Sequence, residues 1–429
     1  MISAPSHQQP LNGNKKLWLL ILPVLLFSCG AFTSLPGDSP IVVHPLPTAD
    51  TSELDHPDDN PPVDVPADET RYQEVFFHGE SFRVEVHKQE FHIALILPFH
   101  QGYKNNQQQR RADLMLEYYQ GVRVALEKLR EMGSTYTLHV FDSKNDSLVV
   151  KRILRKAEMK KMDLIIGPTD QSQLDIAARF AQKHKIPLFS PISVAKLVGY
   201  NPYVYNLKSS PDLKAKEFVA FYQEYHSTKK LVLVRDGGRF NRDFGAALVR
   251  ELDASAISYQ AISGTRDRDW SAVLNAESNM VVLLSEDKSN VSAAVTGMMA
   301  SKKDIHLFGS ERWLDFNAMD YSFWLQLNVH LICSDRAQVN NPLSIEMRKQ
   351  FRSMFNGDPS GFAYSGYDQM LFAGQLLHAF GEHFPLFVLD HNFEYSNTNF
   401  KLRRSGHCMS NSFLYILAFK DHKLEAVDY

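Results

Sequence analysis

Runs of apolar residues alternate with amphipathic stretches from about residue 92 onward. Continuous apolar runs, such as 93–99 and 163–167, are typical of strands that are covered on both faces of a sheet. Between them, apolar residues recur at spacings of three and four, as in 113–133, which predicts helices that bury one face. Strand and helix follow one another with short connections, so the pattern predicts an α/β fold of doubly wound parallel sheets.

The alternation falls into two series, which are separated by a polar joint at 201–211. Strands are expected in the first series at 93–99, 136–143, 163–167 and 186–190, and in the second at 230–236, 258–262, 280–286 and 304–310. Two further helices are expected at 344–355 and 366–381. The final stretch, 412–429, predicts a C-terminal β-hairpin with its turn at Asp421 and His422.

The N-terminus has a different pattern. Lys15 and Lys16 precede an apolar run at 17–27 that is too short to span a bilayer and predicts an export signal. Leu26 lies near the end of this run, and Ser28 and Cys29 follow it directly. This arrangement resembles the lipobox of bacterial lipoproteins. This resemblance implies a signal peptide at 1–28, lipid on Cys29 and a membrane anchor in the cell envelope, facing the periplasm. An ordinary signal peptide, or an uncleaved anchor, with an incidental cysteine is the alternative.

Residues 29–88 are rich in Pro and Asp and have no lasting apolar period, which predicts a disordered tether. The rest of the 429-residue chain is long enough for two or three structured units. A net charge of -3 gives no indication of nucleic-acid binding. The chain has three cysteines, too few for a disulfide framework, and Cys333 and Cys408 either pair or remain as buried free thiols.

Several segments occur in an order and spacing known from one family. They are "IALILPF" at 93–99, "YYQGVRVALEKL" at 118–129, "LIIGPTDQS" at 164–172, "KIPLFSP" at 185–191, "NPYVYNLKSSP" at 201–211 and "GYDQMLFA" at 366–373. With them the chain resembles the type I periplasmic binding proteins, in particular the leucine/isoleucine/valine-binding proteins of amino-acid ABC transporters. The resemblance implies two lobes: an N-terminal lobe of 89–208 and 336–384, and a C-terminal lobe of 209–335 and 385–429.

Ligands of open parallel sheets bind outside the carboxyl ends of the strands. The loop that follows 163–167 carries Thr169, Gln171 and Ser172, whose polar groups and helix N-terminus suit a small polar ligand. Simple capping of the next helix by Thr169 or Asp170 is the alternative. The resemblance adds Ile192 and Ser193 from the N-terminal lobe, and Phe240, Ser285 and Glu311 from the C-terminal lobe. Val194 stands where a Thr is usual in the amino-acid binders, which weakens the case for an amino acid.

No catalytic motif is present: the chain lacks the spacing of a nucleophile elbow, a dinucleotide fingerprint, a P-loop or a CxxC pair. "HAFGEH" at 378–383 does not match the spacing of a zinc protease motif, and we interpret it as a polar helix end. The sequence therefore predicts no enzyme, no cofactor and no metal site.

These features predict an exported binding protein that closes its two lobes around a small polar ligand, such as an amino acid, and presents it to an ABC permease or another partner. The alternative is a scaffold lipoprotein that activates cell-wall (peptidoglycan) synthases through protein–protein contact. The chain resembles known lipoprotein activators of this kind in its two lobes. The sequence leaves the ligand, and the choice between inner and outer membrane, open.

Overall fold

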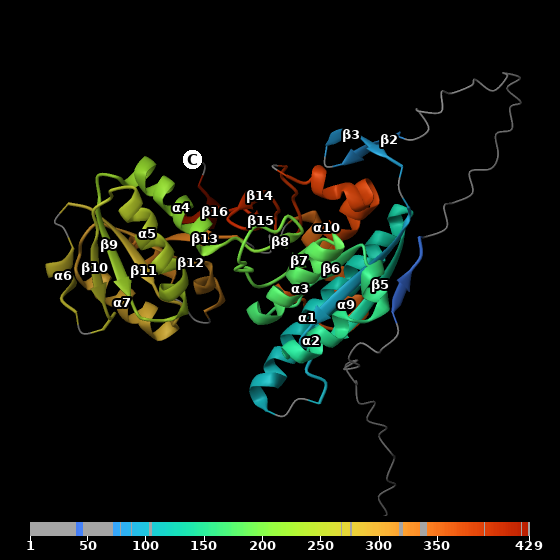
Figure 1. Ribbon diagram of the computed structural model, residues 1–429. Helices are drawn as coiled ribbons and strands as arrows, with labels where there is room; N and C mark the ends of the chain where they lie inside the picture. The colour runs from blue at the N-terminus through green and yellow to red at the C-terminus, as the bar shows by residue number, and fades with distance from the viewer. Residues whose placement is uncertain are drawn as a thin grey trace, which may run out of the picture. The chain divides into compact units, whose positions relative to one another are not determined.

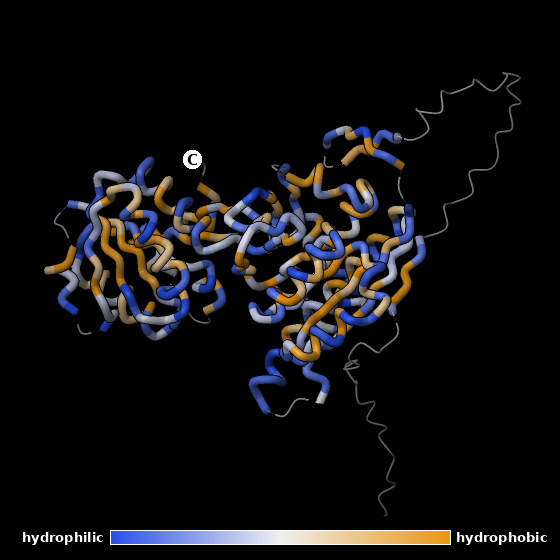
Figure 2. The backbone as a smooth tube through the Cα atoms, viewed as in Figure 1, coloured by the Kyte–Doolittle hydropathy of each residue, from blue (hydrophilic) through white to orange (hydrophobic). Residues whose placement is uncertain are grey.

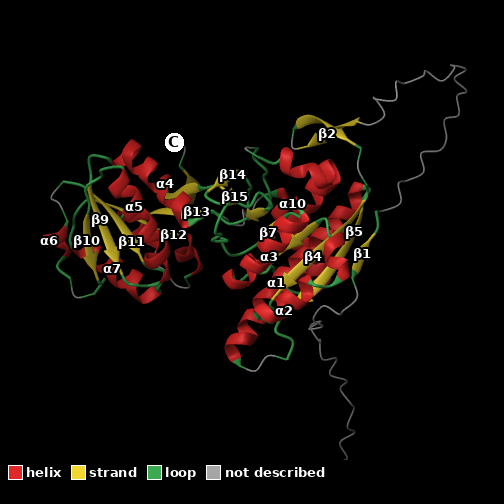
Figure 3. Cartoon of the chain, viewed as in Figure 1, coloured by secondary structure: helices red, strands yellow, loops and turns green. Residues whose placement is uncertain are grey.

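The computed structural model describes residues 40–45, 72–77, 79–86, 88–102, 105–266, 268–274, 277–316, 321–334, 341–389, 391–421 and 423–427. All of them belong to one compact unit that spans residues 34–429. The predicted signal peptide, Cys29 and most of the predicted tether lie outside the described residues. The described strands form two large sheets and one hairpin, and helices cover the large sheets (Figure 1; Figure 3).

The first large sheet is the centre of the N-terminal lobe. Its strands are, in spatial order, β1 (Ile41–Val43), β5 (Thr135–Asp142), β4 (Glu90–Leu97), β6 (Leu164–Ile166), β7 (Leu188–Ser190), β8 (Val204–Asn206), β15 (Cys408–Asn411) and β14 (Leu402–Ser405). From β5 to β15 neighbouring strands are parallel, whereas β1 and β14 are antiparallel to their neighbours. One face packs against α1 (Asn106–Leu129), α9 (Pro342–Phe355) and α10 (Gly361–Phe380), and the other against α2 (Ser147–Leu154) and α3 (Gln171–His184).

The second large sheet is the centre of the C-terminal lobe. Its strands are, in spatial order, β10 (Gln260–Ser263), β9 (Lys230–Arg235), β11 (Asn279–Leu284), β12 (Ile305–Ser310), β13 (His330–Cys333), β16 (Tyr415–Lys420) and β17 (Lys423–Ala426). The first five are parallel, and β16 and β17 are antiparallel additions that form the predicted C-terminal hairpin. One face packs against α4 (Pro211–Phe221) and α5 (Ala246–Ala254), and the other against α6 (Trp270–Val273), α7 (Lys288–Ala300) and α8 (Tyr321–Gln326).

The central strands are apolar along their whole length because helices cover both of their faces. Figure 2 shows this as continuous hydrophobic colour along strands of both sheets. Every residue of β11 is buried, for example, and four of its six side chains are Val or Leu. The prediction of doubly wound sheets is confirmed by this arrangement.

The chain passes between the two sheets three times: between β8 and α4, between β13 and α9, and between β15 and β16. The first and third crossings are hydrogen-bonded to each other. Ser209 donates its hydroxyl proton to the carbonyl of Phe413 at 3.1 Å, and the side-chain amide of Asn411 donates to the carbonyl of Leu207 at 3.3 Å. Two of the three segments that join the lobes are therefore held to each other by hydrogen bonds.

Helices α1 and α10 cross at very short distance in the N-terminal lobe. A Cβ atom at Gly121 would lie 1.8 Å from the carbonyl oxygen of Ala363, and one at Gly366 would lie 2.0 Å from that of Tyr118. Both positions therefore require glycine, because backbone occupies the place of a side chain. This contact places the first residues of α10 beside the loops that follow β6 and β7.

Two segments differ from their predicted places. Within 29–88, the structure describes β1, which extends the first sheet, and a hairpin of β2 (Tyr72–Phe77) and β3 (Glu80–Glu85). The hairpin is held because Phe77 and Phe82 both pack edge-on against Phe380 of α10, with ring centroids 5.1 and 5.3 Å apart. Apolar residues alternate with polar ones in 72–85, and this pattern could have predicted the hairpin.

The second difference concerns 385–429, which was assigned to the C-terminal lobe as a whole. The structure pairs β15 with β8 and thereby places β14 and β15 in the first sheet, and only β16 and β17 lie in the second. The side-chain amide of Asn206, on β8, contacts Cys408 and Ser410 of β15 and fixes this pairing.

Cys333 and Cys408 are both buried free thiols, and they belong to different sheets. Among the described residues, no helix combines the length and the apolar character that crossing a membrane requires.

Candidate functional site

A cleft of about 1130 Å³ is lined by residues from both lobes. The N-terminal lobe contributes the loops after β6 and β7, the start of α10 and Asn397. The C-terminal lobe contributes the start of α4, the segment after β9 and the residues that follow β12 and β13. The lining includes Thr169, Asp170, Gln171, Ile192, Ser193, Val194, Lys196, Lys208, Lys214, Arg239, Arg242, Asp243, Glu311, Arg312, Asp315, Ser334, Phe362 and Tyr364. Because these residues follow the carboxyl ends of parallel strands, the cleft lies where open α/β sheets bind their ligands.

The loop after β6 owes its shape to Gly167. This residue has a φ of +91°, and a Cβ atom there would lie 2.1 Å from the carbonyl oxygen of Ile96. A tight turn follows directly after the strand, and Asp170 then caps α3 by accepting a hydrogen bond from the Ser172 amide at 3.0 Å. The predicted alternative of helix capping therefore applies to Asp170, while Thr169 and Gln171 line the cleft.

The cleft is more basic than acidic. Six of its lining residues are Lys or Arg and four are Asp or Glu: Lys196, Lys208, Lys214, Arg239, Arg242 and Arg312 against Asp170, Asp243, Glu311 and Asp315. The first residues of α3, α4 and α10 also line it, so three helix N-termini add partial positive charge. The cleft therefore has a positive balance that favours an anionic group.

A buried polar network supports the wall that the N-terminal lobe contributes. Gln369 of α10 accepts a hydrogen bond from the Tyr118 hydroxyl at 2.7 Å and donates one to the carbonyl of Pro191 at 2.9 Å. Pro191 directly precedes Ile192 and Ser193, so this network fixes the loop after β7 against α1 and α10. Gln369, the last residue of the segment "GYDQ", thus has a structural role beneath the cleft.

Asp368, beside Gln369, holds the loop that carries Asn397. Its carboxylate accepts hydrogen bonds from the backbone amides of Ser396, Asn397 and Thr398 and from the Ser396 hydroxyl, at 2.6 to 3.1 Å. Burial raises the pKa of Asp368 to about 6, although these hydrogen bonds act in the opposite direction. The cleft wall therefore depends on a carboxyl group that is fully buried.

Residues 111–385, more than half of the chain, match the family described as periplasmic binding protein. The chain belongs to the periplasmic binding protein family. A comparison with curated proteins finds no significant match.

Solved structures of other periplasmic binding proteins share the fold. A protein of Rhodospirillum rubrum assigned as a branched-chain amino acid ABC transporter has a TM-score of 0.61 at 13% identity, over 79% of this chain and 100% of that one. A branched-chain amino acid ABC transporter periplasmic ligand-binding protein of Burkholderia xenovorans has a TM-score of 0.56 at 13% identity, over 79% and 94%. An ABC transporter substrate-binding protein of Desulfitobacterium hafniense in complex with Leu has a TM-score of 0.51 at 12% identity, over 79% and 100%. The two-lobed type I fold, implied by the sequence resemblance, is thereby confirmed.

In this periplasmic binding protein, the cleft brings together five of the eight predicted ligand contacts: Thr169, Gln171, Ile192, Ser193 and Glu311. Several of their polar groups are engaged within their own lobe. The Gln171 side chain donates to the Lys196 carbonyl and to Asp175 and accepts from the Lys196 amide, at 2.7 to 3.0 Å. The Ser193 hydroxyl donates to the carbonyl of Thr169.

Glu311 joins two elements of the C-terminal lobe. Its carboxylate accepts a hydrogen bond from Lys214 of α4 at 3.0 Å and another from the Ser334 amide at 3.0 Å. Arg312, the next residue along the chain, pairs instead with Glu286 at 3.6 Å.

The remaining predicted contacts lie outside the cleft lining. Ser172 bonds to Asp170 and Ser147. Phe240 stacks on Phe244 with ring centroids 4.9 Å apart, and Ser285 is fully buried. These side chains support the walls rather than face the cleft.

None of the six basic residues that line the cleft was among the predicted ligand contacts. Lys208 lies on the first crossing between the lobes, and Arg239 and Arg242 follow β9. The strand-end rule could have indicated Arg239 and Arg242, because they follow β9 as Phe240 does, whereas Phe240 was expected only from the resemblance. A strand end indicates a loop but not which of its side chains face the ligand.

Proposed function

We propose that this chain is an exported, lipid-anchored binding protein whose two lobes close around a small anionic ligand and present it to a transporter or another partner. The cleft at the carboxyl ends of the strands carries the proposal, since its walls come from both lobes and its charge balance is positive. A ligand that contacts both walls favours the closed arrangement and so shifts the equilibrium between open and closed forms.

A carboxylate is the anionic group that best fits this cleft. Three helix N-termini and six basic side chains suit one. Leucine, in the Desulfitobacterium hafniense complex, and 3,4-dihydroxybenzoic acid, in a Rhodopseudomonas palustris solute-binding protein with a TM-score of 0.52 at 14% identity, both carry that group. The lining also contains Val194, which has no hydroxyl, and the aromatic residues Phe362 and Tyr364. These side chains favour a carboxylate ligand that also has an apolar part over an amino acid without one.

The scaffold alternative has one observation in its favour. Gln171, Ser193 and Glu311 already use their polar groups for contacts within their own lobes. A protein that acts on peptidoglycan synthases by surface contact needs no free polar groups in its cleft.

A ligand screen followed by a charge substitution tests the proposal. We would follow thermal unfolding of the purified chain with L-leucine, dicarboxylates and 3,4-dihydroxybenzoate, since a ligand at a hundred times its Kd stabilises the folded state by about 2.7 kcal/mol. We then expect Lys208→Met to weaken binding of the best ligand by about tenfold, because it removes one of the positive charges that line the cleft. The matched control is Lys216→Met, on the exposed surface of α4, which should bind as the wild type does.

Two outcomes would contradict the proposal. Equal binding by the Lys208 and Lys216 variants would mean that the ligand does not occupy this cleft. Failure of every carboxylate to shift the unfolding temperature, together with direct binding of a purified peptidoglycan synthase, would favour the scaffold instead.

A further inference from the structure

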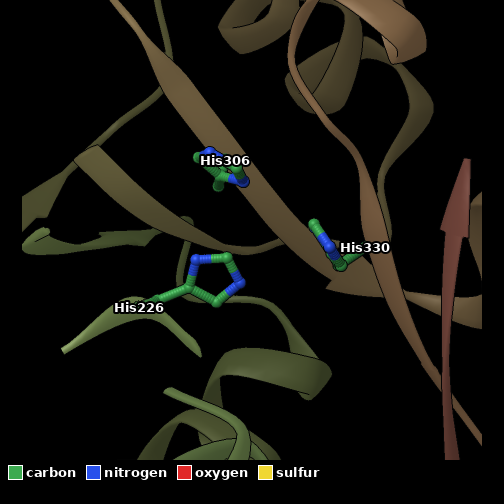
Figure 4. Close-up of side chains that lie close together, drawn as sticks. All are labelled: His226, His306 and His330. Carbon is green, nitrogen blue, oxygen red and sulfur yellow. The ribbon is translucent and has the colours of Figure 1, made fainter. Parts of the chain in front are cut away.

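Three histidines that are far apart in the sequence meet at one place in the C-terminal lobe. His226 ends the π-helical turn Tyr222–His226 that follows α4, His306 is the second residue of β12, and His330 is the first residue of β13. Figure 4 shows the three imidazoles facing a common space between the two strands and the turn. One nitrogen from each ring lies within 4.8 Å of the others.

Two buried nitrogens of this cluster lack hydrogen-bond partners among the described residues. His226 is only 7% exposed, yet its Nδ1 makes no hydrogen bond with any described residue, and the same is true of the buried Nδ1 of His306. An unpaired nitrogen in such a place destabilises the folded protein, because burial removes its hydrogen bonds to water and nothing replaces them. The cluster therefore contains nitrogen lone pairs that a ligand could satisfy at no loss of other hydrogen bonds.

His330 is oriented in the way that metal-binding histidines usually are. Its Nδ1 lies 2.7 Å from the carbonyl oxygen of Asn328, which can only accept, so Nδ1 carries the proton and Nε2 carries the lone pair. Burial lowers the pKa of His330 to about 3 and that of His226 to about 4, which is consistent with neutral imidazoles. Burial and then Lys229 lower the pKa of His306, while Asp304 raises it.

We propose that His226, His306 and His330 bind one divalent transition-metal ion of the Zn²⁺ type, at the end of the second sheet opposite to the cleft. Three imidazole nitrogens are the ligand set of zinc sites that keep a fourth position for water. Nitrogen ligands at about 2.05 Å in a tetrahedron lie about 3.3 Å apart, so the rings must approach one another by about 1.5 Å at most. His306 is only partly buried, whereas His226 and His330 are buried.

The composition of the site also predicts selectivity. None of the three ligand groups is an oxygen, whereas Ca²⁺ and Mg²⁺ bind mainly to oxygen. Cu²⁺, Ni²⁺ and Co²⁺ share the preference of Zn²⁺ for imidazole. A large excess of Ca²⁺ or Mg²⁺ should therefore leave Zn²⁺ binding unchanged.

An alternative account is a purely aromatic cluster, since the His226 ring lies 4.8 Å from those of both Phe221 and His306. The test is calorimetric titration of the chelator-treated full chain with Zn²⁺, supported by the visible spectrum with Co²⁺. We expect one tight site, and at least hundredfold weaker binding in His306→Gln, because the loss of a direct ligand exceeds the 10–100-fold effect of an outer-shell partner. The matched control is His139→Gln, which changes a half-buried histidine of the N-terminal lobe near His92.

Circular dichroism and urea unfolding establish that each variant is folded, and His226→Gln and His330→Gln repeat the test from the other two elements. If one of the three variants fails to fold, the other two still decide. The proposal is overturned if the wild type binds no Zn²⁺, or if the folded variants bind it as tightly as the wild type does.

Discussion

The buried carboxyl group of Asp368 predicts that stability falls as the pH rises from about 4 to about 6. In the folded protein its pKa is about 6, against 3.8 in an unfolded chain. The folded state therefore holds the proton more tightly. The stabilisation is fully present below the lower value and is lost as the pH passes through the higher one.

The size of the effect follows from these two values. One pKa unit corresponds to 1.36 kcal/mol, so ionisation of Asp368 costs about 3 kcal/mol of folding free energy at neutral pH. Four hydrogen bonds to the carboxylate oppose this cost, and burial exceeds them. For a domain of marginal stability, 3 kcal/mol is a large share of the total.

The assay is urea unfolding of the wild type and of Asp368→Asn at several pH values between 4 and 7. The amide cannot ionise, so the free energy of unfolding of the wild type minus that of the variant should fall by about 2.5 kcal/mol across this range. Asp113→Asn, at an exposed position of α1, controls for the loss of one acidic group. A difference that stays constant with pH, or that grows as the pH rises, would show that the hydrogen bonds outweigh burial and would refute the reasoning.

Two further substitutions test the packing around the cleft. Gly366→Ala should destabilise the protein by about 1–3 kcal/mol in urea unfolding, because the new Cβ would lie 2.0 Å from the carbonyl oxygen of Tyr118, whereas Gly357→Ala, with its closest contact at 3.9 Å, should cost far less. Equal costs would mean that α1 and α10 can separate freely. Asp170→Ala should cost about 1 kcal/mol by removing the N-cap of α3, and an unchanged unfolding midpoint would show that the cap is dispensable.

The sheets were predictable because their strands are buried on both faces. A run such as 280–284 has no polar face, and among soluble folds this indicates a strand covered by helices on both sides. The place of the cleft was predictable as well, because parallel strands end at one edge of the sheet and the residues that follow them meet there. Thr169 and Gln171 line the cleft for this reason.

The places of β14 and β15 could not be read in the same way. Leu402–Ser405 contains two arginines, a pattern that is typical of an exposed segment. Its neighbour β15 pairs with β8, which lies about two hundred residues earlier in the chain. The partner that decides the pairing is Asn206, whose side chain contacts both Cys408 and Ser410. A local pattern of apolar residues carries no information about such a distant contact.

The histidine cluster was invisible for a related reason. A metal motif is recognised in sequence when its ligands share one helix or one loop, and the segment "HAFGEH", which has two closely spaced histidines, lacks such a spacing. In the structure, His378 and His383 of that segment contact Ser134 and Glu85 instead. The three histidines that do meet come from a turn and two strands. The β12–β13 pairing places His306 and His330 on neighbouring strands, and the turn after α4 adds His226.

β12 and β13 carry different chemistry at their two ends. Their amino ends hold His306 and His330, and their carboxyl ends lead to Glu311 and Ser334 in the cleft. At about 3.3 Å per residue, five residues of strand place His306 about 16 Å from Glu311. Because this distance exceeds any direct contact, a substitution at His306 tests the metal site while leaving the cleft intact. Zn²⁺ binding and carboxylate binding can therefore each fail without bearing on the other.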